Sequence, residues 1–353
     1  GHSALVGRLL HALSVLAYDA QLVDLAKSVA NELIAIAGTI EDQRVALDAY
    51  VIAVLLVAHF ESVPRAVRLL DGLEEFRAKS ESPFFEGIVH RCRAQILQQA
   101  GDIESAYAEY RQVEQIVERY ALGPAWQSAA NNVAVINMEL GQYDDAIELL
   151  SEMERYASVR NANELLLGAY GNLAICHWET GEYTECARAA KQLRSIQEGM
   201  AVKSRRHEAW SMLGLVALRL GNVTEAKNCE REILLWEGET PSWYGDTSYR
   251  EMFLGRLAAL EGNEADAMRR IRSGIEAYED RDFFCRSRLQ LEWARLAMAT
   301  DAEGAAAVAQ DVREAARRSG AAPLVESADR ILDRLNLRDG GASSKAMSVR
   351  LSL

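Results

Sequence analysis

The sequence NNVAVINMELGQYDDAIELLSEMERY, residues 131–156, has the pattern of two amphipathic helices joined by a short turn. Apolar residues recur in it at spacings of three and four, which places them on one face of each helix. Gly141 is suited to end the first helix, because glycine readily takes the left-handed backbone of a helix stop. Ala146 is small where the second helix must cross the first. One such hairpin cannot bury its own apolar face, so the pattern predicts further copies.

Copies of this hairpin recur about every 40 residues. Each has a small residue in its first helix, a turn seven residues later and a second small position five residues beyond the turn. The first position is occupied by Ser14, Val54, Ala94, Ala134, Ala174, Gly214, Gly255 and Ala294. The turn and the second position pair Gln21 with Ala26, Glu61 with Ala66, Gly101 with Ala106, Gly141 with Ala146, Gly181 with Cys186, Gly221 with Ala226, Gly262 with Ala267, and Asp301 with Ala306. Degenerate first and last copies are expected of units that cap a stack.

The signature Gly-x-large-x-x-small resembles the tetratricopeptide repeat (TPR), and the resemblance covers residues 4–317. The period is longer than the usual ~34 residues, and the proline that usually closes a repeat is missing. Long repeats of this kind are similar to those of MalT-like sensor regions and of bacterial peptide-pheromone receptors. The resemblance implies an all-α fold: a right-handed, TPR-like superhelical solenoid of about eight hairpins plus a C-terminal capping helix.

The expected domain organisation is one solenoid over residues 4–335, followed by a flexible tail over residues 336–353. The first residues, Gly1-His2-Ser3, look like a cleavage scar, so we expect the chain to be a piece of a longer protein. No signal peptide is visible, and the longest apolar run, residues 51–58, is too short to cross a bilayer. The five cysteines lack CxxC spacing and are expected to be buried thiols in a reducing, cytoplasmic compartment.

No motif for catalysis or cofactor binding is present. The sequence has no GxxxxGK[ST], GxSxG, HExxH or GxGxxG. His177 is expected to be a core or groove-edge residue, because its neighbours pack inward. The net charge of −13 argues against general binding to nucleic acids or anionic membranes. We therefore expect a protein that is not an enzyme and holds neither metal nor cofactor.

Candidate binding residues follow from the expected concave face, which the first helix of each hairpin lines in repeats of this kind. Units three to five concentrate side-chain amides there, which can pair with a peptide backbone, and Trp178 adds an apolar anchor. The predicted peptide- or ligand-binding residues are Arg91, Gln95, Gln98, Asn131, Asn132, Met138, Asn172 and Trp178. Along the same stripe, Arg219, Arg256 and Arg295 would extend the site toward an acidic segment of the partner.

Alternatives remain for several of these residues. Met138 and Trp178 could belong to the core between repeats, and Asn132 and Asn172 could bond within the turn between helices. The loop that contains Trp243 and Tyr244 is a competing site, either as an exposed patch for a partner or as a plug folded into the groove.

These observations predict a non-enzymatic scaffold that binds a protein or peptide partner in its concave groove. The alternative is a ligand-sensing regulatory domain of a larger MalT-like signalling ATPase, kinase or transcription regulator, with an adjoining effector domain. Neither hypothesis includes direct contact with nucleic acid or membrane.

Overall fold

The computed structural model describes Leu5 and residues 9–10, 12–13, 22–78, 82–120, 123–199, 206–237 and 248–339. Within these ranges the chain forms helices and no strand. The helices are α2 (Val23–Ala37), α3 (Gln43–Phe60), α4 (Val63–Arg77), α5 (Pro83–Gln99), α6 (Ile103–Arg119), α7 (Gly123–Leu140), α8 (Tyr143–Arg160), α9 (Asn163–Glu179), α10 (Tyr183–Gly199), α11 (Arg206–Arg219), α12 (Val223–Glu237), α13 (Ser248–Leu260), α14 (Glu264–Ala277), α15 (Phe283–Ala297), α16 (Ala302–Ser319) and α17 (Ala322–Asp339).

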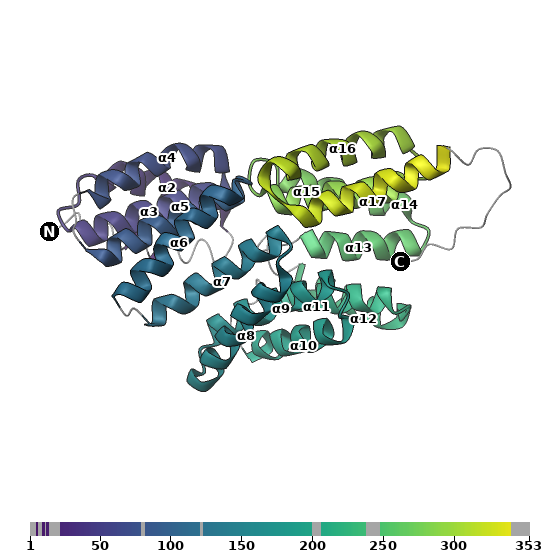
Figure 1. Cartoon of the computed structure of the whole chain (residues 1–353), viewed down its shortest axis with the longest axis horizontal. Helices are drawn as coiled ribbons and strands as arrows, with labels where there is room; N and C mark the ends of the chain where they lie inside the picture. Colours follow the sequence, from purple (N-terminus) through teal and green to yellow (C-terminus); the bar gives the residue numbers. More distant parts are fainter. Residues whose placement is uncertain are drawn as a thin grey trace.

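The predicted hairpins are confirmed where the structure describes them. From α3 to α16, consecutive helices pack as seven pairs, which we number units two to eight, and α17 caps the last pair (Figure 1). Helix α2 is the second helix of unit one, and most of the predicted first helix of that unit lies outside the described residues. Helix α17 ends at Asp339, so the last helix is four residues longer than the predicted end at Leu335.

The turns repeat one backbone geometry, as the sequence predicts. Five glycines at these turns have positive φ: Gly101, Gly141, Gly181, Gly221 and Gly262. At the turn after α7, the Gly141 N–H donates to the Met138 carbonyl at 3.1 Å, and the Gln142 N–H donates to the Asn137 carbonyl at 2.7 Å. The other four turns have the same pair of bonds, which is the glycine-dependent helix stop that satisfies the last carbonyl groups.

Small residues lie where the two helices of a unit cross. Ala134 and Ala146 are both fully buried, and Gly214 has no room for a side chain, because a Cβ there would lie 2.4 Å from the Phe253 ring. The prediction for unit eight is wrong by one residue: Ala305 is buried and Ala306 is only half-buried. Asp301 caps α16 by accepting the Gly304 N–H at 2.9 Å, which shifts the turn to Thr300.

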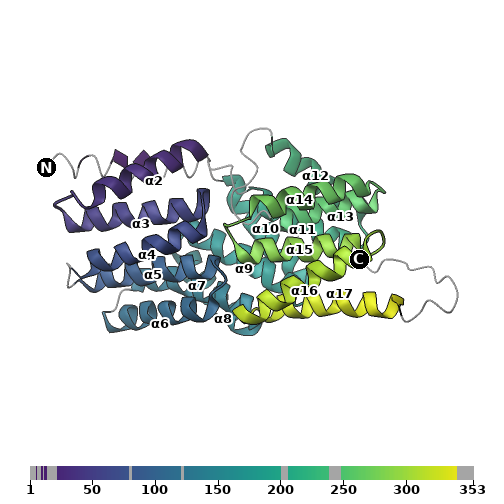
Figure 2. The same cartoon turned by 90° about the horizontal axis from the view of Figure 1, so that it is seen from above.

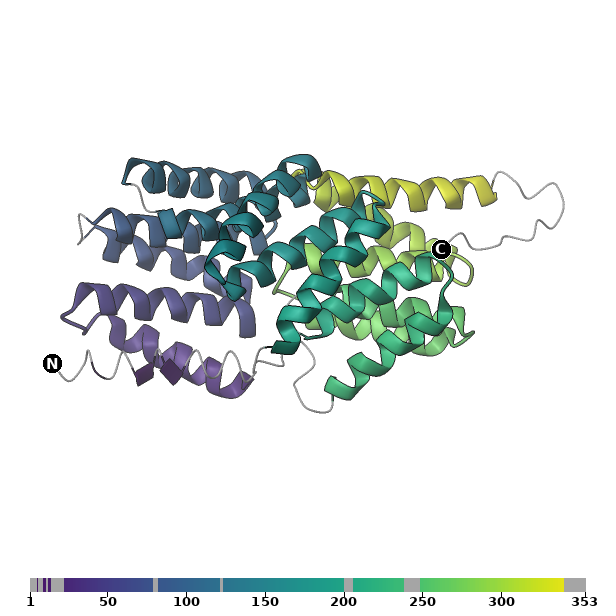
Figure 3. The same ribbon diagram turned by 90° about the horizontal axis from the view of Figure 1, so that it is seen from below.

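The solenoid curves with the first helix of each unit on the inside. Helices α3, α5, α7, α9, α11, α13 and α15 each pack against the next member of this series, and within the described ranges no comparable packing links successive second helices. We call these seven helices the inner layer and the second helices the outer layer. Figures 2 and 3 show the curved stack from above and below, with α2–α6 at one end and α13–α17 at the other.

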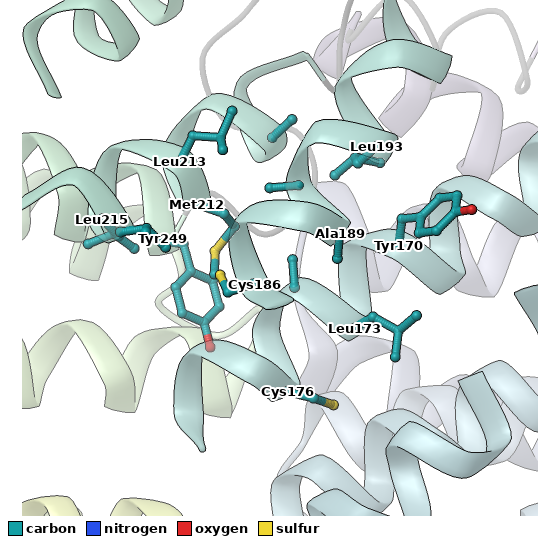
Figure 4. Packing of buried hydrophobic residues seen from close by; sticks show 14 of the residues in the cluster. Tyr170, Leu173, Cys176, Cys186, Ala189, Leu193, Met212, Leu213, Leu215 and Tyr249 are labelled. Carbon is teal, nitrogen blue, oxygen red and sulfur yellow. The ribbon is translucent and has the colours of Figure 1, made fainter. Parts of the chain in front are cut away.

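Between the two layers, the described residues form three large clusters of buried side chains and one small one. Figure 4 shows a part of one large cluster, where Leu173 and Cys176 of α9, Leu193 of α10 and Leu213 of α11 pack together. All five cysteines are buried, and burial raises the pKa of the Cys176 thiol to about 12. They act as small apolar residues, as predicted.

Helix α3 is long and apolar enough to cross a membrane by length and composition. In this fold it is a core helix. It packs between α2, α4 and α5, and its Leu47, Val54 and Phe60 side chains are fully buried.

Replacing Ala146 with leucine is expected to lower the free energy of unfolding by about 1–3 kcal/mol, because the added atoms overpack the crossing of α7 and α8. The buried neighbours of Ala146 in this core include Leu150 and Met153. Urea unfolding of Ala146→Leu, with Ala307→Leu on the exposed face of α16 as control, measures the effect. An unchanged midpoint for Ala146→Leu would mean that the repeat register is wrong.

Candidate functional site

The predicted binding residues lie on three neighbouring helices of the inner layer. Arg91, Gln95 and Gln98 are on α5, Asn131, Asn132 and Met138 on α7, and Asn172 and Trp178 on α9. Seven of the eight are half-buried, and Met138 is a core residue that is only 9% exposed. The inner face of units three to five is therefore a partly open, amide-rich surface, which we call the amide face.

Two hydrogen bonds on the amide face join side chains of adjacent units that lie 41 residues apart, one residue more than the repeat period. The Asn172 amide nitrogen donates to the Asn131 side-chain oxygen at 3.0 Å, and the Gln98 amide nitrogen donates to Glu139 Oε1 at 3.0 Å. Asn172 thus bonds across the repeats rather than within the turn. Because an amide side chain has both a donor and an acceptor, the asparagine pair keeps one polar group on each residue for another partner.

Gly168 makes space for this asparagine pair. A Cβ at Gly168 on α9 would lie 3.1 Å from the Asn131 side-chain oxygen, which is closer than ordinary van der Waals contact. The absence of a side chain at that position lets α9 approach α7 at the level of Asn131. Gly168 is not among the residues predicted from the sequence, because its role depends on how closely α9 approaches α7.

Trp178 lies in a cluster of aromatic rings and arginines at the end of the amide face. Its ring centroid is 5.4 Å from that of Tyr183, and the Arg256 guanidinium lies 5.9 Å from the Trp178 ring. Arg219 donates to the Tyr183 hydroxyl at 3.0 Å. Trp178 also packs against the main core cluster, so it combines a core contact with a half-exposed ring.

In units six to eight the equivalent positions are more often buried than in units three to five. Ser211, Leu215, Leu218, Met252, Leu291 and Met298 each have less than a tenth of their surface exposed. The polar, half-buried positions of the stripe are therefore concentrated in units three to five, where the sequence places the site.

The arginines of units seven and eight are paired inside the protein. Arg256 forms two hydrogen bonds to Glu292, at 2.8 and 2.7 Å, and Arg295 pairs with the same carboxylate. Glu292 is only 1% exposed. Burial raises the pKa of its carboxyl group, but Arg256 and Arg295 outweigh burial and hold that pKa at about 2. Of the three arginines predicted to receive an acidic segment, only Arg219 is exposed.

Other sequence predictions are located as follows. His177 is buried, with its Nδ1 atom 2.6 Å from Glu182 Oε2, as expected of a residue at the edge of the core. The Trp243-Tyr244 loop lies outside the described residues. Among the residues that the structure describes, no group of three or more His, Cys, Asp or Glu side chains could hold a metal ion.

No model of a known protein family matches this sequence, and no curated protein matches it. Three solved structures are similar over nearly their whole length. NprR in complex with its cognate peptide NprX has a TM-score of 0.61 and is 15% identical, with 98% of this chain and 94% of that chain covered. The Rap conjugation gene regulator of the plasmid pLS20, in complex with the Phr* peptide, has a TM-score of 0.54 and is 12% identical, with coverage of 98% and 99%.

A Rap protein complexed with competence and sporulation factor has a TM-score of 0.52 and is 15% identical, with 96% of this chain and 98% of that chain covered. At such low identities the similarity establishes the fold and nothing finer. With the repeated helix pairs, the glycine turns and the inner and outer layers described above, it shows that the chain is a TPR-like superhelical solenoid.

Proposed function

We propose that this protein binds a peptide, or an extended segment of a partner protein, on the amide face, and that it acts by binding rather than by catalysis. The observation that carries the proposal is the row of half-buried amides on α5, α7 and α9, which includes the Asn131–Asn172 pair. Two of the similar structures, NprR and the pLS20 Rap protein, hold peptides.

The spacing of the inner helices suits an extended chain. Packed helices lie about 8–10 Å apart, and an extended peptide advances about 3.3 Å per residue, so successive inner helices would meet about every third residue. A peptide of roughly 6–9 residues would span the three helices of the amide face. The side-chain amides satisfy backbone groups of the peptide without the desolvation cost of full charges, and the Trp178 ring offers an apolar contact.

The second candidate function, a ligand-sensing regulatory domain, is compatible with the same surface when the ligand is a peptide. A sensor for a small molecule would instead need an enclosed pocket that buries most of the ligand. The half-exposed amide face favours the peptide. Under either hypothesis we place the protein in the cytoplasm, where its five buried cysteines stay reduced.

Selection from a display library of random linear peptides tests the proposal without knowledge of the natural partner. We expect enrichment of peptides that bind with micromolar affinity or better, measured by calorimetry with the purified protein. A parallel selection against Asn131→Ala/Asn172→Ala should not enrich the same peptides. Equal enrichment on both baits, or none on the native protein, would contradict the proposal.

A further inference from the structure

The two ends of the solenoid touch each other, which a simple open stack of repeats does not require. The turns of units two, three and four (residues 59–63, 101 and 140–141) meet the segments that begin α15 and α17 (residues 280–283 and 320–323). We call these contacts the clasp. Figure 1 shows the ends of α4–α6 beside those of α15–α17, and the core cluster that contains Ile103 and Ile136 also contains Phe284 and Leu324.

Each level of the clasp has its own contact. The Val63 N–H donates to the Asp280 carbonyl at 2.6 Å. At the next level, a Cβ on Gly101 would lie 2.8 Å from the Phe283 ring, so the ring packs directly on the glycine turn. At the third level, a Cβ on Gly141 would lie 3.3 Å from the Pro323 ring, and α17 packs against α7.

The clasp combines turns and helix ends with buried side chains of one core cluster, and it carries one unfavourable term. Asp280 has a left-handed backbone, with φ of 59°, which costs free energy for a residue other than glycine. On the other side of the contact, burial together with Arg281 lowers the pKa of His59 to about 4, so this histidine is uncharged at neutral pH. Helices on the two sides of the clasp share far less contact than the two helices of each hairpin, so the clasp can open while the hairpins stay folded.

We propose that the clasp is a gate: it opens to admit a ligand to the inner layer and closes behind it. The amide face lies on α5, α7 and α9, inside the turn of the superhelix that the clasp closes. A bound peptide on that face would therefore be enclosed by units seven and eight until the clasp reopens. Two tests follow. The test with a bound peptide rests on the proposed function, whereas the test by hydrogen exchange does not.

The Val63 amide reports clasp opening directly. Val63 is the first residue of α4, and the first N–H groups of a helix have no acceptor within it. Its protection from hydrogen exchange therefore depends on the Asp280 carbonyl across the clasp. By contrast, the Cys186 N–H donates to the Glu182 carbonyl within unit five and serves as the internal control.

A disulfide can lock the clasp. A Cβ on Gly141 would lie 3.8 Å from the Ala322 Cβ, the usual separation in a disulfide, so Gly141→Cys/Ala322→Cys should cross-link on oxidation. Because Gly141 has a φ of 80°, the cysteine strains the turn, so the oxidised form is compared only with the reduced form of the same variant. In the oxidised form we expect exchange at the Val63 amide to slow at least tenfold relative to the reduced form, with exchange at Cys186 unchanged. Equal exchange of Val63 in the two forms would overturn the proposal.

The kinetic arm uses a peptide obtained from the display selection. We expect its association rate to fall at least tenfold in the oxidised protein and to recover on reduction, and the release of preloaded peptide to slow likewise. Equal rates in both forms would show that the clasp is not a gate. If the selection yields no peptide, the proposed function fails, and the exchange arm still decides whether the clasp opens.

A second variant tests the proposal without the disulfide, and so decides it even if the two cysteines do not cross-link. Phe283→Ala removes the ring that packs on Gly101 and should speed exchange of the Val63 amide at least tenfold, with Cys186 unchanged. Phe84→Ala, at an exposed ring on α5, is the matched control and should change neither amide. Unchanged Val63 exchange in Phe283→Ala would also overturn the proposal.

Discussion

Replacing Glu292 with glutamine is expected to lower the free energy of unfolding by about 3–5 kcal/mol, because it leaves two half-buried guanidinium groups without the buried carboxylate that neutralises them. Glu292 is 1% exposed and bonds to both Arg256 and Arg295. Urea unfolding measures the loss. The control is Glu185→Gln, which removes an exposed pair with Arg188 and should leave the unfolding midpoint unchanged. A midpoint for Glu292→Gln equal to that of the native protein would contradict the buried pair.

The same carboxylate predicts a sensitivity to acid. The pKa of Glu292 is lowered from an ordinary 4.5 to about 2 in the folded protein. A carboxyl group with a lowered pKa stabilises the fold fully above pH 4.5, and this stability is lost as the pH falls toward 2. The difference in stability between the native protein and Glu292→Gln should therefore shrink over that range. A difference that stays constant would assign the stability to packing instead of charge.

Replacing Asn131 and Asn172 together with alanine is expected to weaken peptide binding by about 10- to 100-fold. Each lost hydrogen bond to a ligand accounts for about 0.5–1.5 kcal/mol, and 1.4 kcal/mol corresponds to a factor of ten in the dissociation constant. Calorimetric titration with a selected peptide measures the loss. The matched control is Asn228→Ala on outer helix α12, where the amide bonds only to Glu225 of the same helix among the described contacts.

The fold of this chain is readable from local signals. Gly141, like its counterparts at the other turns, marks a helix stop by its backbone freedom alone, and each buried small residue marks a crossing. These signals act within one hairpin, so the sequence reveals them without knowledge of distant contacts. The prediction for unit eight was wrong by one residue because the turn there has no glycine, and the side chain of Asp301 sets the start of α16.

The clasp could not be predicted in the same way. The contact between Phe283 and Gly101 depends on the small rotations between neighbouring units, added over six repeats. No pattern within a single repeat predicts the total rotation. For the amide face the sequence located the residues but not their pairing. The Asn131–Asn172 bond joins residues 41 apart, whereas the repeat equivalent of Asn172 is Asn132, so the register of the repeats alone does not give this pair.

Buried charge was the other feature missed. Glu292 lies three residues before Arg295 and 36 residues after Arg256, which places one carboxylate between the two arginines of adjacent units. The sequence analysis treated those arginines as available to a partner. In the structure they neutralise Glu292, because a carboxylate this deeply buried needs partners that remain charged.

Photo-crosslinking tests the location of the binding site most directly. A selected peptide with a photoreactive residue at each position in turn is bound, irradiated and mapped by mass spectrometry, with Trp243→Ala/Tyr244→Ala tested in parallel. We predict crosslinks within residues 91–99, 131–139 and 168–178, together with unchanged affinity for the Trp243→Ala/Tyr244→Ala variant. Crosslinks confined to the loop of Trp243 and Tyr244 or to the outer layer, with binding lost in that variant, would contradict the assignment of the site to the amide face.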